Sequence, residues 1–135
     1  MKNKIIQPKN WKPAKGYANG ILDSNGYLFI GGQIGWDSQQ VFNSNTFVGQ
    51  MEQALINIVQ ILEEAGGDIQ NIVRFTWYIK DKKEYLKNQK EIGKVYQKIM
   101  GHYYPAMSML VVHDLIEDAA LLEIEATAII SKKNK

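Results

Sequence analysis

The chain contains no cysteine and a single arginine among its 135 residues. Without cysteine there can be no disulfide framework, no thiolate nucleophile and no thiolate metal site. Only Arg74 could grip a carboxylate or phosphate through the two parallel hydrogen bonds of a guanidinium group. Long apolar runs and the apolar core of a signal peptide are also missing, so we expect a soluble, cytoplasmic protein with no membrane partner.

Basic charge is scarce away from the two ends of the chain. Residues 1–15 hold five lysines and residues 132–135 hold three, which leaves eight basic and fourteen acidic residues between positions 16 and 131. The body therefore carries a net charge near −6. Nucleic-acid-binding domains usually present a basic stripe on their folded surface, so we do not expect a nucleic-acid partner.

What the sequence does contain is typical of one globular domain. Hydrophobic residues make up 45% of the chain and charged residues 22%, a composition too apolar for intrinsic disorder. The length is that of a common domain, and no internal repeat, linker or low-complexity segment divides it. The expectation is a single domain over residues 1–135.

Hydrophobic periodicity and turn residues predict two helices among several strands. The predicted elements are a hairpin over residues 20–30 with its turn at 23–26, a helix from residue 46 with a stop at Gly66 and Gly67, a strand over 71–79, a helix over 82–100 capped by Asp81, and strands over 107–113 and 121–130. This order suggests an α+β fold with both helices on one face of a mixed sheet.

The alternation in the strand over residues 71–79 places Val73, Phe75, Trp77 and Ile79 on the face that the helices would cover. The opposite face would be partly polar. Its expected residues are Thr76, Tyr78, Glu123, Glu125 and Thr127. That face must be solvated or covered by another subunit, which makes self-association an expectation.

Familiar metal and cofactor motifs are missing. His102 and His113 have no partners at metal-ligand spacing, so no metal site is predicted. The serines lack a nucleophile-elbow context. Gly31-Gly32 does not extend into a dinucleotide-binding motif, and the pair indicates a close backbone approach or two exposed N–H groups. No cofactor is expected.

Glu123 and Glu125 are the remaining candidates for chemistry. They lie two residues apart on a predicted strand, so they share a face and their Cα atoms are about 6.6 Å apart. Such a pair can support acid–base chemistry on water. A solvated sheet face, or a charge pair with a neighbouring subunit, is the commoner role of such carboxylates. These two residues alone leave the function open.

A series of short motifs runs from about residue 13 to residue 130. They are Pro13-Ala-Lys-Gly-Tyr17, Leu28-Phe-Ile-Gly-Gly-Gln-Ile34, Gln50 with Ala54-Leu-Ile-Asn57, Ala65-Gly66, residues 68–78, Tyr104-Pro-Ala106 and Leu122-Glu-Ile-Glu-Ala126. In this order they resemble the RidA family of reactive intermediate deaminases, also called YjgF-like proteins. The resemblance implies a chorismate-mutase-like fold of the bacillary type, assembled as a homotrimer with small-molecule pockets between subunits.

The resemblance also implies an activity in metabolite damage control. Active members of the family are hydrolases that convert enamines and imines, such as 2-iminopropanoate, to a carbonyl compound and ammonia without a cofactor. Carried over by position, Glu123 is the catalytic residue that orients or activates water, and Tyr17 is a pocket tyrosine. Gly31 stands where a serine is usual before Gly32, and Gln89 stands where many members have an asparagine.

Two further pocket positions differ from deaminase-active members. Met107 replaces the arginine that binds the substrate carboxylate, and Met109 replaces a frequent cysteine. Losing a charge-assisted hydrogen bond of about 1.5–3 kcal/mol should weaken binding of 2-imino acids at least about tenfold. Whether Arg74 reaches the pocket as a substitute is open. A pocket with Met107 and Met109 at its base, and with Trp36 or Tyr104 near its wall, would suit ligands without a carboxylate.

The leading interpretation is a trimer that binds a small metabolite and hydrolyses an imine or enamine, with 2-imino acids disfavoured. The alternative is a non-catalytic metabolite-binding or regulatory trimer, so the sequence leaves open whether the chain is an enzyme. An endoribonuclease or translation-inhibitor role, attached to some relatives, has weaker support because the body is acidic. The strands that carry Met107 and Glu123 are expected to lie side by side.

Overall fold

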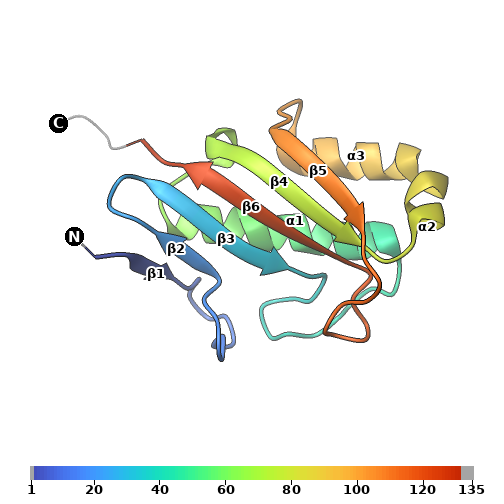
Figure 1. Ribbon diagram of the computed structural model, residues 1–135, viewed down its shortest axis with the longest axis horizontal. Coiled ribbons are helices and arrows are strands. Elements are labelled where there is room, and N and C mark those ends of the chain that lie inside the picture. Colours follow the sequence, from blue (N-terminus) through green and yellow to red (C-terminus); the bar gives the residue numbers. More distant parts are fainter. Residues whose placement is uncertain (1, 132–135) are drawn as a thin grey trace.

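One mixed sheet of six strands runs through the protein (Figure 1). The structure is a computed structural model that describes residues 2–131. The strands are β1 (Lys4–Ile6), β2 (Gly20–Leu22), β3 (Tyr27–Gln33), β4 (Ile72–Ile79), β5 (Ala106–Val111) and β6 (Leu122–Ile129). Their order is β1-β2-β3-β6-β4-β5, with β4 and β5 parallel and the other neighbours antiparallel.

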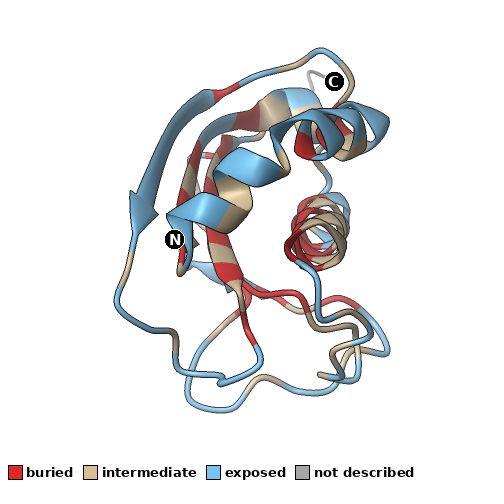
Figure 2. Cartoon of the chain, turned by 90° about the vertical axis from the view of Figure 1, so that its right-hand side faces the viewer, coloured by how far each residue is buried: buried red, intermediate tan, exposed pale blue. Residues whose placement is uncertain are grey.

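Three α-helices accompany this sheet, and the long ones cover a single face of it. They are α1 (Phe47–Glu64), α2 (Lys82–Lys87) and α3 (Gln89–Met100), and a single 3-10 turn, η1 (Ile69–Asn71), precedes β4. Buried residues gather between the sheet and the helices (Figure 2). The predicted mixed sheet with helices on one face is confirmed, but the prediction of two helices is wrong.

The second predicted helix is divided at Asn88. Its start is as expected, since the Asp81 carboxylate accepts hydrogen bonds from the backbone N–H groups of Lys83 and Glu84. Seven residues after Asp81, the Asn88 side chain donates to the carbonyl oxygen of Glu84, and the backbone of Asn88 leaves the helical region at φ −110° and ψ 17°. Asparagine competes for backbone hydrogen bonds in this way, so α2 ends there and α3 begins.

The predicted hairpin turn is confirmed, and the first helix begins within one residue of the predicted start. The Asp23 carboxylate accepts hydrogen bonds from the N–H groups of Asn25 and Tyr27, and Gly26 adopts φ +96°, which closes the β2–β3 hairpin. Thr46 is the N-cap of α1, and its side chain accepts from the N–H of Gly49. The short strand β1, which pairs with β2, was not predicted, because three residues show no usable periodicity.

The alternation predicted for β4 is wrong at its start. The register between β4 and β6 shifts between Ile72 and Arg74, and this bulge inserts one extra residue. Ile72 is fully buried, while Val73 is 39% exposed. From Phe75 onward the predicted faces are correct, because alternation resumes after the bulge.

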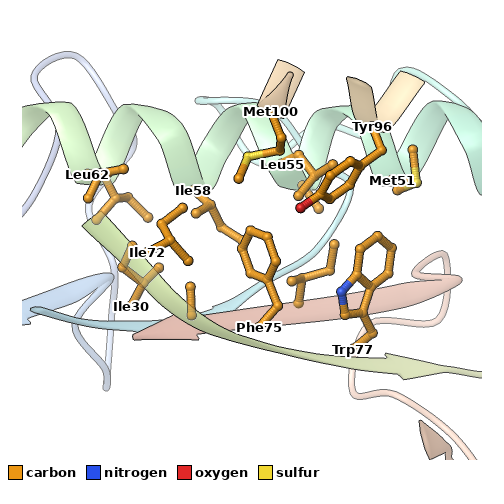
Figure 3. Close-up of a cluster of buried hydrophobic side chains, with 14 of the residues drawn as sticks. Ile30, Met51, Leu55, Ile58, Leu62, Ile72, Phe75, Trp77, Tyr96 and Met100 are labelled. Atoms are coloured by element: carbon orange, nitrogen blue, oxygen red, sulfur yellow. The ribbon is translucent and has the colours of Figure 1, made fainter. Parts of the chain in front are cut away.

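The core lies between α1, α3 and the covered face of the sheet (Figure 3). Apolar side chains of α1 face Phe75 and Trp77 of β4 across this layer, and Tyr96 and Met100 of α3 close one side of it. The opposite face of the sheet, here called the open face, carries Thr76 and Tyr78 of β4 together with the alternate residues of β6. No helix among residues 2–131 is long and apolar enough to cross a lipid bilayer.

Adjacent residues at the bulge should respond very differently to truncation. Ile72→Ala removes a fully buried side chain and should lower the free energy of unfolding by about 2–5 kcal/mol. Val73→Ala should cost less than about 1 kcal/mol, because its side chain faces solvent. Urea unfolding of both variants measures this difference. A larger loss of unfolding free energy for Val73→Ala would show that Val73 is the buried residue, as unbroken alternation along β4 predicts.

Candidate functional site

One hollow lies where β3 ends and β6 begins, and we call it the Glu123 hollow. It encloses about 400 Å³. Its lining residues are Tyr17, Ala18, Asn19, Gly31, Gly32, Gln33, Ile34, Trp36, Leu115, Ile116, Glu117 and Glu123. Four of the predicted site residues therefore come together here, namely Tyr17, Gly31, Gly32 and Glu123, and Trp36 joins them as a wall.

One glycine, Gly32, makes room for the carboxylate of Glu123. The register between β3 and β6 shifts between Ile30 and Gln33, so Gly31 and Gly32 form an irregular stretch of the strand. A Cβ atom at position 32 would overlap Oε2 of Glu123. Gly32 therefore allows the Glu123 carboxylate to lie directly over the strand backbone, which is the close approach that the sequence indicated.

The environment of Glu123 favours its protonated form. Burial raises the pKa of the Glu123 carboxyl above its ordinary value, and the negative charge of Glu125 raises it further. No hydrogen bond from the described residues holds this carboxylate, whereas Glu125 accepts one from the Tyr78 hydroxyl at 3.1 Å. Glu123 is thus a carboxyl group free to exchange a proton with a molecule in the hollow.

The pKa of Tyr17, which lines the same hollow, is also shifted. Burial raises the pKa of the Tyr17 hydroxyl, and the negative charge of Glu117 adds to the effect. Tyr17 therefore stays protonated over the physiological range and can donate or accept a hydrogen bond at the wall.

Buried amides hold two of the segments that line the Glu123 hollow. Nδ2 of Asn57, on α1, donates to the carbonyl oxygens of Ile34 and Trp36 at 3.2 and 2.8 Å. Nε2 of Gln33 donates to Oδ1 of Asn19 at 3.2 Å, which ties β3 to the segment that carries Tyr17. These contacts fix the hollow to the core, since buried amides without partners would be costly.

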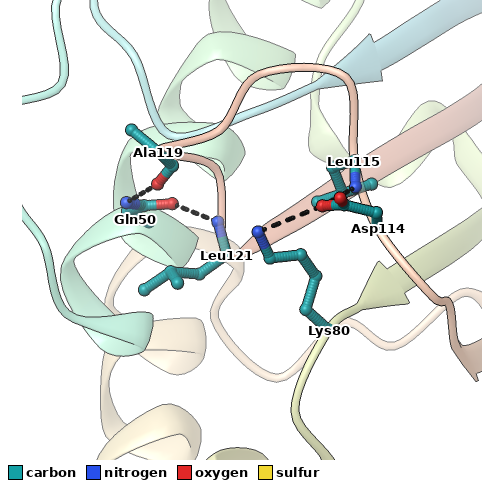
Figure 4. Close-up of polar contacts among 6 residues, drawn as sticks. All are labelled: Gln50, Lys80, Asp114, Leu115, Ala119 and Leu121. Atoms are coloured by element: carbon teal, nitrogen blue, oxygen red, sulfur yellow. Dashed lines mark hydrogen bonds and ion pairs between the residues drawn. The ribbon is translucent and has the colours of Figure 1, made fainter.

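A third amide holds the loop that contributes Leu115, Ile116 and Glu117 to the lining of the hollow, and Figure 4 shows its contacts. Gln50 is almost fully buried on α1, and its side chain donates to the carbonyl oxygen of Ala119 at 2.9 Å and accepts from the N–H of Leu121 at 2.8 Å. At the other end of the loop, Lys80 forms an ion pair of 3.4 Å with Asp114. Leu115, Ile116 and Glu117 lie between these two anchors, and the side chain of Ile116 is 96% exposed.

A second hollow lies between β5 and the helices, and we call it the Met107 hollow. It encloses about 210 Å³. Its lining residues are Trp77, Tyr85, Gln89, Ile92, Gly93, Tyr96, Tyr104, Met107 and Met109. The other three predicted site residues, Gln89, Met107 and Met109, therefore come together here with Tyr104. The indole N–H of Trp77 is buried and has no acceptor within the described part of the chain.

The two hollows lie on opposite faces of the sheet. Met107 and Met109 pair with Phe75 and Trp77 and share their helix-covered face, whereas Glu123 pairs with Tyr78 on the open face. The expectation that the strands of Met107 and Glu123 lie side by side is wrong, because β4 separates β5 from β6. A single protomer therefore keeps its predicted site residues apart.

Arg74 lines neither hollow. It is exposed on the open face, opposite Thr127 of β6 and Ala106 of β5. Within residues 2–131 no three histidine, aspartate or glutamate side chains gather closely enough to hold a metal ion.

Of the aromatic residues that line the Met107 hollow, the sequence predicted Tyr104 but not Trp77, Tyr85 and Tyr96. In the sequence, Trp77 falls on the buried face of its strand and Tyr96 falls on the buried face of its helix. Both positions therefore indicate ordinary core residues. The spacing of Gln89, Ile92, Gly93 and Tyr96 along one face of α3 was the available signal. Only the parallel pairing of β5 with β4 brings that face against Met107 and Met109.

Comparison with known families and curated proteins gives consistent matches. Residues 8–130 match a family described as Endoribonuclease L-PSP. A RutC family protein of Pyrococcus horikoshii is 34% identical over 129 residues, which cover 95% of this chain and 98% of that protein. The human 2-iminobutanoate/2-iminopropanoate deaminase is 31% identical over 103 residues, which cover 76% of this chain and 72% of the human protein.

Solved structures show the same arrangement of helices and strands. A crystal structure of a Rid family protein from Yersinia pestis aligns with a TM-score of 0.81 and 30% identity, over 96% of this chain and all of that one. The crystal structure of E. coli TdcF with bound serine aligns with a TM-score of 0.80 and 29% identity, over 95% of this chain and 99% of that one.

Replacing the Glu123 carboxyl by an amide should stabilise the protein at neutral pH. A raised pKa means that ionisation of Glu123 opposes folding as the pH rises, and Glu123→Gln removes that ionisation. Thermal unfolding should give a higher Tm for the variant at pH 7, with the difference shrinking to zero at a pH below the ordinary pKa of glutamate. A lower Tm for the variant at pH 7 would mean that the ionised carboxylate is held by stabilising contacts instead.

Proposed function

The chain belongs to the family described as Endoribonuclease L-PSP, as its resemblance to RidA predicts. On this basis we propose that the protein is a cytoplasmic homotrimer. We propose that its substrates are imines or enamines that carry no carboxylate group, and that it hydrolyses them. The name of the human relative, an imine deaminase, supports the type of reaction. The serine bound to TdcF supports a small ligand. The proposed site residues are Glu123 as the catalytic carboxyl and Tyr17, Gly31, Gly32, Gln89, Met107 and Met109 as the binding groups.

The separation of the two hollows is the observation that carries the proposed assembly. Glu123 and Met107 lie on opposite faces of one sheet, so one protomer cannot present both to a single small molecule. A neighbouring protomer can bring its Met107 hollow against the Glu123 hollow of the first. Exposed apolar side chains on β5, among them Leu110 and Val111, favour such burial, because an uncovered edge strand with this composition invites association.

The chemistry requires a positioned water molecule and a proton-exchanging group. Water adds to the electrophilic imine carbon, the C–N bond breaks, and the nitrogen leaves as ammonia while the carbon becomes a carbonyl. No electrons are transferred, so the reaction needs no redox partner. Glu123 can accept a proton from water and return it to the departing nitrogen, because its raised pKa brings the two protonation states closer in free energy.

The substrate class follows from the residues that line the two hollows. Neither hollow has an arginine or lysine in its lining. The resemblance to RidA aligns Met107 with the family's carboxylate-binding arginine. A carboxylate placed there would lose solvation without gaining a cationic partner. Neutral or cationic imines avoid this cost, so 2-imino acids should be poor substrates.

Ammonia release from freshly generated imines should depend on Glu123. Glu123→Gln should reduce the rate by about 10²- to 10⁴-fold, the usual contribution of a general acid–base group. Glu125→Gln is the matched control on the same strand and face, and it should reduce the rate by less than about tenfold. Equal rates for the wild type and Glu123→Gln would exclude Glu123 as the catalytic group, and no ammonia from any imine would favour the non-catalytic binding trimer.

An arginine at position 107 should give the protein activity on 2-imino acids. Met107→Arg should raise kcat/KM for 2-iminopropanoate about tenfold or more, because a charge-assisted hydrogen bond contributes about 1.5–3 kcal/mol. Sedimentation should give about three times the 15.4 kDa mass of one chain for both proteins. An intact trimer with no gain would show that the missing arginine does not set specificity, and a 15.4 kDa species would contradict the trimer.

The family's description raises RNA cleavage as a second candidate. Backbone phosphates are bound mainly by lysine and arginine, and neither hollow has such a residue in its lining. A steep fall of RNA affinity with salt would support this candidate, and weak binding that is independent of salt would exclude it.

A further inference from the structure

The lining of the Met107 hollow consists mainly of aromatic rings and thioethers. Four aromatic rings and two thioethers surround it, contributed by Trp77, Tyr85, Tyr96, Tyr104, Met107 and Met109. No charged side chain takes part in the lining. Aromatic faces and edges, together with polarisable sulfur, favour contact with another aromatic ring.

The hydroxyl groups of the two stacked tyrosines already take part in hydrogen bonds within the chain, although the Tyr104 hydroxyl still has its own proton to donate. The rings of Tyr96 and Tyr104 lie parallel, with centroids 5.1 Å apart. The Tyr96 hydroxyl donates to the carbonyl oxygen of Tyr103 at 2.9 Å, and the Tyr104 hydroxyl accepts from the Gln97 amide at 3.1 Å. Tyr104, which is 56% exposed, therefore offers mainly ring surface to a ligand, whereas Tyr96 is buried.

A single glycine creates the space in this wall. Along the face of α3 that borders the hollow, Ile92 and Tyr96 carry large side chains, but Gly93 carries none. A Cβ atom at position 93 would have no atom within 4 Å. Glycine inside a helix costs roughly 0.5–1 kcal/mol relative to alanine, so this position lowers helix stability and leaves a dent beside β5.

The volume of the hollow restricts what can fill it. At about 210 Å³ it is smaller than the roughly 300–1,000 Å³ of sites for drug-sized ligands. A cavity of about 150 Å³ lined by apolar side chains is known to hold benzene. One six-membered ring with a short linker fits this space, and a nucleotide does not.

We infer that the Met107 hollow binds the aromatic ring of the substrate, so that the preferred substrates are arylalkyl imines without a carboxylate. This inference rests on the proposed function for its reaction, but the ring-binding step is separate from hydrolysis. The ketone released from such an imine keeps the ring and the linker. It therefore serves as a stable probe of the hollow, independent of catalysis.

Methyl NMR of the ¹³C-labelled methionines tests the ring-binding step. The chain has five methionines, and single substitutions assign the signals of Met107 and Met109. Titration with 4-phenyl-2-butanone should shift both signals saturably through the ring current. The cyclohexyl analogue should bind roughly 2- to 12-fold more weakly, the range expected for an aromatic contact beyond simple burial, and pyruvate should leave both signals unchanged.

Two leucine variants on α3 complete the test. Gly93→Leu should fill the dent and weaken binding of 4-phenyl-2-butanone at least tenfold, while Lys94→Leu, which adds the same side chain at an exposed position outside the lining, should leave binding unchanged. Gly93→Ala adds one methyl group and should retain binding with a raised Tm. Both leucine variants should keep the wild-type circular dichroism.

Three results would overturn the ring-binding inference. They are unchanged binding of the phenyl ketone by Gly93→Leu, binding of the cyclohexyl analogue that equals or exceeds it, or saturable shifts with pyruvate. Ammonia release from the corresponding imine is measured separately. Ring binding without ammonia release would leave the ring-binding inference intact and contradict the proposed catalysis. Ammonia release without ring binding would support the proposed catalysis and contradict the ring-binding inference.

Discussion

The packing of α1 against the covered face of the sheet is the constraint on which the other features depend. The buried stripe of α1, which includes Met51, Leu55, Ile58 and Leu62, has no exposed surface and meets the inward side chains of β3, β4 and β6. Because strand side chains alternate, burying one set on the helices forces the other set onto the open face. Glu123 lies on that face for this reason, since its neighbour Leu122 belongs to the core.

The same helix also connects the core to the proposed site. Besides its apolar stripe, α1 carries two buried amides, Gln50 and Asn57, and each binds backbone groups of a segment that lines the Glu123 hollow. A leucine at either position would bury equally well but would leave carbonyl groups without donors. The geometry of the Glu123 hollow is therefore set by the same element that stabilises the sheet.

The edge strand β5 and the lack of a positively charged side chain define the Met107 hollow, which is the second part of the proposed site. β5 pairs only with β4, so one side of its backbone and most of its side chains remain uncovered in the protomer. Met107 and Met109 are 40% and 37% exposed there. Methionine adapts its shape but offers no charge, and the surrounding rings offer none either. Both the proposed assembly and the proposed selectivity follow from this exposed, uncharged surface.

Local sequence signals determined the family and most elements of the fold, apart from β1 and the division of the second helix, and tertiary structure decided how the site residues are distributed. The Asp23 turn, the start of α1 near residue 46 and the period of α1 depend on a few neighbouring residues, so they could be recognised without a structure. The bulge after Ile72 and the position of β4 between β5 and β6 arise from pairing of strands far apart in the chain, which no local pattern encodes. That pairing places Glu123 and Met107 on opposite faces of the sheet.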